Sequence, residues 1–348
     1  MLTAFATSGF GLIFWILAAK LYPIKDVGIA TAMISSIIML VILSGLGLDF
    51  SLVRFFPNYV DKSSALSTCI IITTIFALIF GIIFILGLDL WSQELCLLKS
   101  KIAVIYFIIL AANSIQNLSQ NAFIAMRRAE INFIESLILG SRVVILFPLA
   151  SLGAIGILGA YGISFILANF IALGIFAKFN ITPVIKIDVR FLKEISHFSA
   201  GNYFSALLAS IPNLIMPILV LNILGASETA RYYIAFSIAS LLSTIPTAIS
   251  TSLFVEGSHG APLRKTFFKS ILAASFILVL GVMLLEFFGS YLLGSIGGDY
   301  IEGFKLLKLM ALSSFLITPV LLYLSIKRVQ KEINILIYIS GLMSTLFL

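Results

Sequence analysis

The sequence predicts an all-α, polytopic membrane protein, and three observations support that fold class. Of the 348 residues, 61% are hydrophobic and 11% are charged, whereas soluble domains carry roughly 25% charged residues. The mean hydropathy of +1.16 is too high for a water-soluble globule. The apolar residues form runs of about 18 to 25, a length that crosses a bilayer as a helix. Lipid offers the backbone no hydrogen-bond partners, so these runs must be helical.

Eleven hydrophobic segments are predicted to span the membrane. They lie near residues 1–19, 27–48, 64–88, 102–126, 132–152, 155–177, 198–221, 229–254, 267–288, 306–326 and 333–348. The first has no basic residue ahead of it, unlike a signal peptide, so we expect a true span. The last stops at Leu348 in mid-helix, which predicts an incomplete second half.

The basic residues of the loops predict a cytoplasmic N-terminus. In that orientation fourteen of them lie on the cytoplasmic side: Arg54, Lys62, Arg127, Arg128, Lys178, Lys186, Arg190, Lys193, Arg264, Lys265, Lys269, Lys327, Arg328 and Lys331. Seven lie on the opposite side: Lys20, Lys25, Lys99, Lys101, Arg231, Lys305 and Lys308. The remaining one, Arg142, falls inside a predicted span.

A polar turn occurs twice in the chain, each time between two long apolar segments. Residues 127–132 contain a basic pair and Glu-Ile-Asn, and residues 327–334 contain the same elements. Residues 21–27 and 224–230 form a weaker second pair at nearly the same offset. Duplication of a helical membrane unit is typical of transporters.

The predicted boundary between the two halves is the basic connection 178–197, a cytoplasmic linker that contains Pro183. It separates an N-terminal six-helix lobe, 1–177, from a C-terminal lobe, 198–348. Because six is even, the repeats are expected to share one orientation, with a pseudo-two-fold axis along the membrane normal.

Two charged residues fall in the predicted span 132–152. Arg142 lies about ten residues from its start, and Glu135 precedes it by seven residues, or about 10.5 Å of helix. A charge at mid-bilayer costs roughly 2.5–3.5 kcal/mol, which favours a functional role for Arg142 in lining a water-filled wall, whereas Glu135 either shares that wall or lies at the membrane interface. The alternative is a local salt bridge or snorkelling. Alignment of the repeats places Ile337 and Ser344 opposite this pair, so the charges belong to the first lobe alone.

A stripe of carboxamides follows one face of the predicted span 102–126. Its members, spaced i, i+3, i+4, i+7 and i+8, are Asn113, Gln116, Asn117, Gln120 and Asn121. Hydrogen bonding between helices is one explanation. Lining of a cavity is the other, since amides suit sugar hydroxyls.

Further candidates lie near the span ends and at prolines. Asp49 is interpreted as an interfacial anchor, whereas Arg54 is either such an anchor or a phosphate contact at the inner mouth. Pro212, Pro217 and Pro246 are hinge candidates because a proline breaks helical hydrogen bonding, although kinks also occur in static bundles.

Several function classes are excluded by the sequence. No Walker loop, Ser-His-Asp set or metal-ligand cluster is present, so no enzyme activity, cofactor or metal is predicted. The net charge of +7 resides in loops between spans, which reflects topology and argues against nucleic acid.

Six segments resemble one transporter family: residues 14–23, 26–28, 45–49, 53–57, 125–128 and 156–162. They are similar to the polysaccharide-transporter branch of the multidrug/oligosaccharidyl-lipid/polysaccharide (MOP) exporter superfamily, most specifically over residues 10–57. The branch includes O-antigen and related lipid-linked oligosaccharide flippases of twelve or fourteen helices. The resemblance implies a MATE-like fold of two lobes, from which the N-terminal lead-in and the twelfth helix are missing.

The resemblance also implies a function: translocation of a polyprenyl-diphosphate glycan across the plasma membrane during surface-polysaccharide synthesis. Arg142 would meet the diphosphate, and Glu135, Asn113, Gln116, Asn117, Gln120 and Arg54 complete the candidate cavity set. Expected partners are the lipid-linked oligosaccharide, membrane lipids, and a polymerase or glycosyltransferases. The alternatives are a small-molecule or drug antiporter of the same superfamily, a glycan polymerase, and a non-transporting membrane protein.

Overall fold

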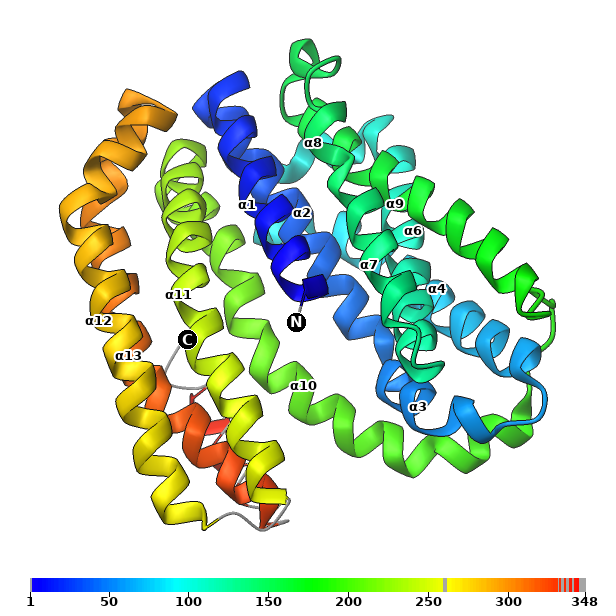
Figure 1. Cartoon of the computed structure of the whole chain (residues 1–348). Coiled ribbons are helices and arrows are strands. Elements are labelled where there is room, and N and C mark those ends of the chain that lie inside the picture. The colour runs from blue at the N-terminus through cyan, green and yellow to red at the C-terminus, as the bar shows by residue number, and fades with distance from the viewer. Residues whose placement is uncertain are drawn as a thin grey trace. The chain divides into compact units, whose positions relative to one another are not determined.

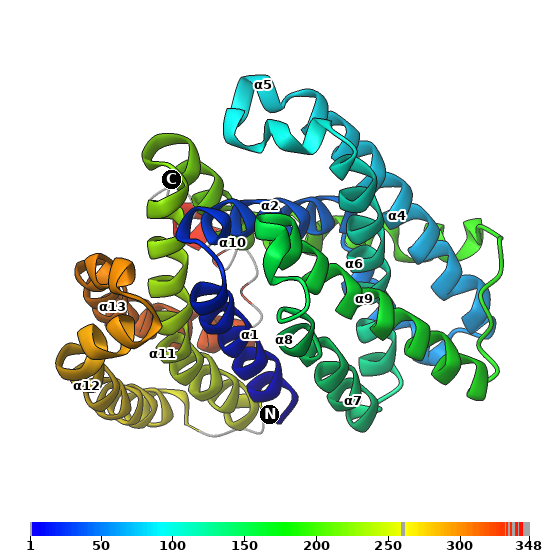
Figure 2. The same cartoon turned by 90° about the horizontal axis from the view of Figure 1, so that it is seen from above.

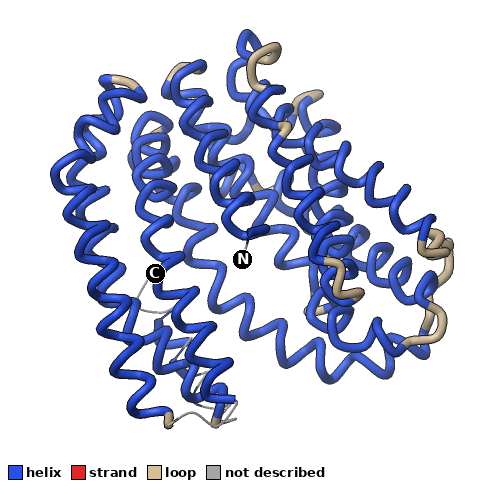
Figure 3. The backbone as a smooth tube through the Cα atoms, in the orientation of Figure 1, coloured by secondary structure: helices blue, strands red, loops and turns tan. Residues whose placement is uncertain are grey.

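The computed structural model describes residues 2–258 and 262–330, together with 332, 335, 338–339 and 341–343. Throughout these residues the chain is helical, with short loops and no strand, as the tube in Figure 3 shows. The all-α prediction is therefore confirmed. The chain forms two compact units, residues 1–229 and 230–348, which are described separately below.

The first unit contains most of the helices, drawn from blue to green in Figure 1. They are α1 (Leu2–Leu21), α2 (Ile24–Gly45), α3 (Leu48–Phe55), α4 (Lys62–Leu86), α5 (Leu88–Trp91), α6 (Ile102–Ala125), α7 (Ala129–Gly140), α8 (Arg142–Ile145), α9 (Gly153–Lys178) and α10 (Val189–Leu224). Helix α6 lies between α4 and α9 and packs on both, which Figure 2 shows from above. Its polar stripe is therefore held inside the unit.

The second unit consists of α11 (Ala226–Ser258), apart from its first turn, with α12 (Leu263–Ile296) and α13 (Phe304–Val329). Helices α12 and α13 are antiparallel neighbours joined by a 3-10 turn, Gly298–Gly303. Arg231 of α11 fixes that turn, since its Nε donates to the Asp299 carbonyl at 2.8 Å. Leu242, Leu278 and Ala311 form the apolar centre between the three helices.

Seven of the described helical segments are long and apolar enough to cross a membrane: Ile24–Gly45, Lys62–Leu86, Ile102–Ala125, Ala150–Lys178, Ala226–Leu253, Leu263–Ile296 and Gly298–Lys327. Thr7–Leu21 and Leu214–Leu224 are shorter apolar helices at the first and seventh predicted spans. Most of the predicted span 333–348 lies outside the described residues. The chain is a multi-span membrane protein.

The predicted span 132–152 is not one continuous helix. It is divided into α7 and the four-residue α8, with a break at Ser141, whose N–H donates to the Ile138 carbonyl in an i to i+3 hydrogen bond at 2.9 Å. Gly140 and Ser141 are weak helix formers, and Pro148 has no N–H with which to continue α8. Glu135 and Arg142 therefore lie on separate helices, α7 and α8.

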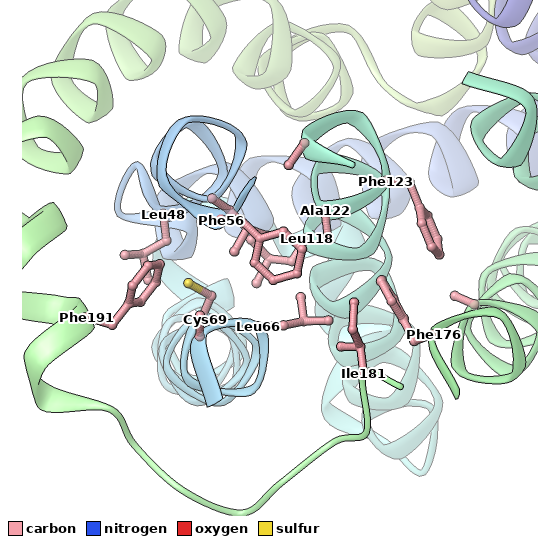
Figure 4. Close-up of a cluster of buried hydrophobic side chains, with 14 of the residues drawn as sticks. Leu48, Phe56, Leu66, Cys69, Leu118, Ala122, Phe123, Phe176, Ile181 and Phe191 are labelled. Atoms are coloured by element: carbon pink, nitrogen blue, oxygen red, sulfur yellow. The ribbon is translucent and has the colours of Figure 1, made fainter. Parts of the chain in front are cut away.

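A buried apolar cluster fixes the cytoplasmic end of the first unit, in the orientation predicted here. Figure 4 shows Phe56, Cys69, Phe123 and Phe176 within it, contributed by different helices and turns. The rings of Phe123 and Phe176 stack with their centroids 4.3 Å apart, joining α6 to α9. Close packing of these buried side chains holds the ends of α6 and α9 together.

Both copies of the repeated polar turn contain an ion pair. Arg128 Nη1 lies 3.2 Å from Glu130 Oε1, and Lys327 Nζ lies 2.9 Å from Glu332 Oε2. The two glutamates are those that the sequence repeat aligns. The division into lobes at 178–197 stays a prediction.

The loop before α10 ends in a polar cap. Asp188 accepts hydrogen bonds from the backbone N–H groups of Arg190 and Phe191, at 3.0 and 3.1 Å. Tyr59 Oη donates to its other oxygen at 2.8 Å. The hydrogen bond from Tyr59 has the largest effect on the pKa of the Asp188 carboxyl and holds it below its ordinary value. The hydrogen bonds from the backbone N–H groups lower the pKa further. The hydrogen bond between Tyr59 and Asp188 also raises the pKa of Tyr59 to about 12.

Replacement Tyr59→Phe should therefore destabilise the protein in a pH-dependent way. At neutral pH we expect a loss of about 1 kcal/mol, the worth of one hydrogen bond. Because the pKa of Asp188 is lower in the folded than in the unfolded protein, its ionised carboxylate stabilises the fold at any pH above the unfolded-state pKa, near 3.9. This stabilisation is lost as the pH falls through the lower, folded-state pKa. Thermal unfolding should thus show the two proteins converging below about pH 4. Tyr291→Phe, at an exposed tyrosine of α12, is the control, and a pH-independent difference would contradict the assignment.

Candidate functional site

A polar cavity of about 190 Å³ lies within the first unit, between α1, α6, α7, α8 and α9. Its wall is formed by Thr7, Phe10, Asn113, Gln116, Asn117, Gln120, Ser136, Leu139, Gly140, Arg142 and Phe165. Five of these are residues that the sequence singled out: Asn113, Gln116, Asn117, Gln120 and Arg142. The fold thus brings the arginine of α8 and the amides of α6 around one space, here named the arginine cavity.

The amides of α6 both bond neighbouring helices and line the cavity. Asn113 Nδ2 donates to Tyr161 Oη of α9 at 2.6 Å. Gln116 Nε2 donates to Glu135 Oε1 of α7 at 3.1 Å. Asn121, by contrast, donates to the Asn117 carbonyl of its own helix at 2.8 Å and is not part of the wall. The two explanations offered by the sequence therefore apply together.

Arg142 is held between aromatic rings. Its guanidinium carbon lies 5.1 Å from the ring centroid of Phe14 and 5.9 Å from that of Tyr161. Both rings present electron-rich faces that attract a cation. A Cβ at Gly11 would lie 3.4 Å from Arg142 Nη2, so α1 leaves room for the guanidinium. The half-buried guanidinium is thereby held at the wall of the arginine cavity.

Glu135 lies behind the cavity wall. It is fully buried and reaches the wall through Gln116. Its second oxygen, Oε2, accepts no hydrogen bond from any residue that the structure describes. The same holds for the buried Oε1 of Gln116. A buried carboxylate and an adjacent amide oxygen thus retain unused acceptor capacity.

A second cavity of about 300 Å³ lies next to the first, between α2, α3, α6 and α10. Its wall is formed by Ile38, Val41, Ile42, Gly45, Gly47, Asp49, Phe50, Asn113, Asn117, Tyr203 and Ser210. Asn113 and Asn117 belong to both walls. We name this space the aspartate cavity.

Sequence reasoning missed part of this second wall. It interpreted Asp49 as an interfacial anchor, whereas the half-buried carboxylate borders the aspartate cavity. Tyr203 and Ser210 were not singled out, because isolated polar residues on a long helix carry no spacing signal. Their place in the wall follows from the packing of α10 on α2.

The remaining candidates lie elsewhere. Arg54 is exposed at the end of α3, where its guanidinium carbon stands 4.5 Å above the ring of Phe198, and it borders neither cavity. Helix α10 continues through Pro212 and Pro217, and α11 through Pro246. The hinge role of these prolines stays a prediction.

Comparison with solved structures shows a MATE-like fold. An outward-facing multidrug resistance MATE family transporter of the MOP superfamily is similar with a TM-score of 0.63 at 14% identity, covering 98% of this chain and 82% of that one. A MATE protein in complex with MaL6 gives 0.61 at 15% identity, with 98% and 83% covered. A MOP superfamily transporter from Pyrococcus furiosus gives 0.56 at 16%, with 98% and 87% covered.

Comparison of the sequence identifies the family. No curated protein matches the chain. The model of the family described as "Polysaccharide biosynthesis protein" matches residues 1–254, which is well over half of the sequence. Similarity to the solved structures establishes the MATE-like fold, and the family match establishes the lineage. The chain belongs to the polysaccharide biosynthesis protein family.

Proposed function

We propose that this protein is a transporter of the MOP superfamily that moves a lipid-linked oligosaccharide across the plasma membrane during surface-polysaccharide synthesis. The family match and the MATE-like fold support the transporter class. The observation that supports the substrate is the arginine cavity, which Arg142 and four carboxamides line together. An anionic, sugar-bearing head group has the chemistry that these side chains bind.

The diphosphate is the part of such a substrate that most needs a partner inside the membrane. A guanidinium offers a planar fork of N–H donors that matches phosphate oxygens. The carboxamides supply both donors and acceptors, which suits sugar hydroxyls. The polyprenyl tail would remain in lipid while the polar head passes through the cavity. We expect alternating access to come from rocking of the two predicted lobes, as in other transporters with internal repeats.

A small-molecule antiporter is the second candidate, and Glu135 favours it. A fully buried carboxylate beside a cavity suits an organic cation or a coupling ion. Arg142, which lines the cavity itself, opposes a cationic substrate. The Pyrococcus furiosus neighbour is described as having a binding pocket of reverse polarity that suggests a different function. The charge of the binding pocket is therefore a useful criterion for distinguishing functions among proteins of this fold.

The basic residues of the loops support one orientation of the transporter. We propose a cytoplasmic N-terminus, with the basic loops on the inner side of the plasma membrane. Transport would be driven by an ion gradient or the membrane potential, since the sequence contains no nucleotide-binding motif. A polysaccharide polymerase or glycosyltransferases would act next to it.

Reconstitution would test the proposal directly. Purified full chain in proteoliposomes should transfer a fluorescent polyprenyl-diphosphate oligosaccharide between leaflets at least about tenfold faster than protein-free vesicles. A second set of vesicles should contain a cationic drug and an imposed pH gradient. Absence of glycolipid transfer for a panel of glycans would contradict the proposal, and drug transport in its place would establish the antiporter.

A further inference from the structure

The aspartate cavity has a chemical character that the arginine cavity lacks. The arginine cavity presents one cation among amides, whereas its neighbour presents one carboxylate with amides, a hydroxyl and aromatic rings. We propose that the aspartate cavity is a sugar subsite, in which Asp49 accepts hydrogen bonds from the hydroxyl groups of the sugar attached to the diphosphate. This inference rests on the proposed function and specifies where its selectivity resides.

The two cavities are arranged as neighbouring subsites of one ligand. Asn113 and Asn117, one helical turn apart on α6, border both spaces. A ligand whose anionic group lies beside Arg142 would therefore pass these amides before it reached Asp49. A glycosyl diphosphate has that order of groups, because the first sugar is bonded directly to the phosphate. Positive charge at one end and negative charge at the other would also fix its direction.

The local backbone makes Asp49 available as an acceptor. Leu46 and Gly47 adopt left-handed conformations, with φ of 49° and 72°, and end α2 abruptly. Helix α3 begins at Leu48, so Asp49 lies in its first turn, where the helix dipole stabilises a carboxylate. Among the described residues, no basic side chain forms an ion pair with Asp49.

The rest of the wall suits one sugar ring. Tyr203 Oη donates to the Leu43 carbonyl at 2.7 Å, which holds the aromatic ring in place as an apolar surface for sugar C–H groups. Ser210 of α10 and Asn117 of α6 are both half-buried and polar. A volume of about 300 Å³ is at the small end of ligand sites, which run from roughly 300 to 1,000 Å³. It fits a single ring better than a long glycan.

Binding measurements on the full chain in lipid nanodiscs would test the subsite. The probes are polyprenyl diphosphate and the same lipid carrying one neutral hexose. Wild-type protein should bind the glycosylated lipid about tenfold more tightly than the bare diphosphate, the effect of a good charged hydrogen bond. Asp49→Asn should reduce this preference to about twofold or less, while the Kd for the bare lipid stays unchanged. Glu94→Gln, at an exposed carboxylate of the first unit, is the matched control.

Two further variants make the outcome unambiguous. Ser210→Ala removes one hydroxyl from the same wall and should lower the preference about threefold, even if Asp49→Asn proves too unstable to purify. Arg142→Gln should weaken both lipids equally, because it acts on the diphosphate. Unchanged preference in Asp49→Asn and Ser210→Ala, with both lipids still bound, would overturn the subsite and leave the proposed function intact. Wild-type protein that binds neither lipid would overturn both.

Discussion

Replacing Arg142 with alanine should lower glycolipid transfer in proteoliposomes by at least about 30-fold. Truncation of one partner of a desolvated charged contact costs roughly 2–5 kcal/mol, and each 1.4 kcal/mol is tenfold. The other polar residues of the cavity wall named above are neutral amides and hydroxyls. They offer hydrogen bonds to the diphosphate but no charge. Arg142→Lys should show an intermediate rate, since lysine keeps the charge and loses the planar fork.

The fold of the variant must be checked separately, because Arg142 also contacts Phe14 and Tyr161. Loss of these cation–π contacts is expected to cost about 0.5–2 kcal/mol each, which thermal unfolding would register. Lys178→Ala removes an exposed cation at the end of α9 and should leave both transport and stability unchanged. Normal transfer by a folded Arg142→Ala protein would remove Arg142 from the substrate site.

Gly28→Ala should cause a large loss of stability through the addition of a single methyl group. A Cβ at Gly28 would lie 1.8 Å from the carbonyl oxygen of Ala226 and 2.6 Å from its carbonyl carbon. Both atoms are backbone, so no side chain can rotate away. Helix α2 and the turn after α10 would have to separate, at a cost of about 3 kcal/mol or more. A decrease in Tm of roughly 6–12 °C in detergent would follow.

The matched control is Gly174→Ala in α9. No atom lies within 4 Å of a Cβ at that position, so the methyl group meets open space. Alanine is the better helix former by about 1 kcal/mol, and the variant should be equal to the wild type or slightly more stable. Equal Tm values for the Gly28 and Gly174 variants would show that α2 does not approach Ala226 as closely as described.

The sequence predicted the helical elements well, because membrane spans are long and apolar. Helices α4, α6 and α9 begin and end within a few residues of the predicted segments 64–88, 102–126 and 155–177. It failed at the segment 132–152, where the break at Ser141 depends on weak local preferences that hydropathy does not detect. Part of the candidate site could be predicted, because Arg142 and the carboxamides of α6 are polar residues within otherwise apolar segments.

By itself, the sequence determined the fold class, the helical segments and the unusual polar residues within them. The reason is that lipid penalises every unpaired backbone group and every charge, so each exception is conspicuous. Only the tertiary structure decided which exceptions meet. It joined Arg142 and the α6 amides around one cavity, placed Glu135 behind Gln116, placed Asp49 at the wall of a second cavity and left Arg54 outside both. Which of these residues become neighbours depends on how helices that are far apart in the chain pack together. The spacing of residues along a single helix contains no information about that packing.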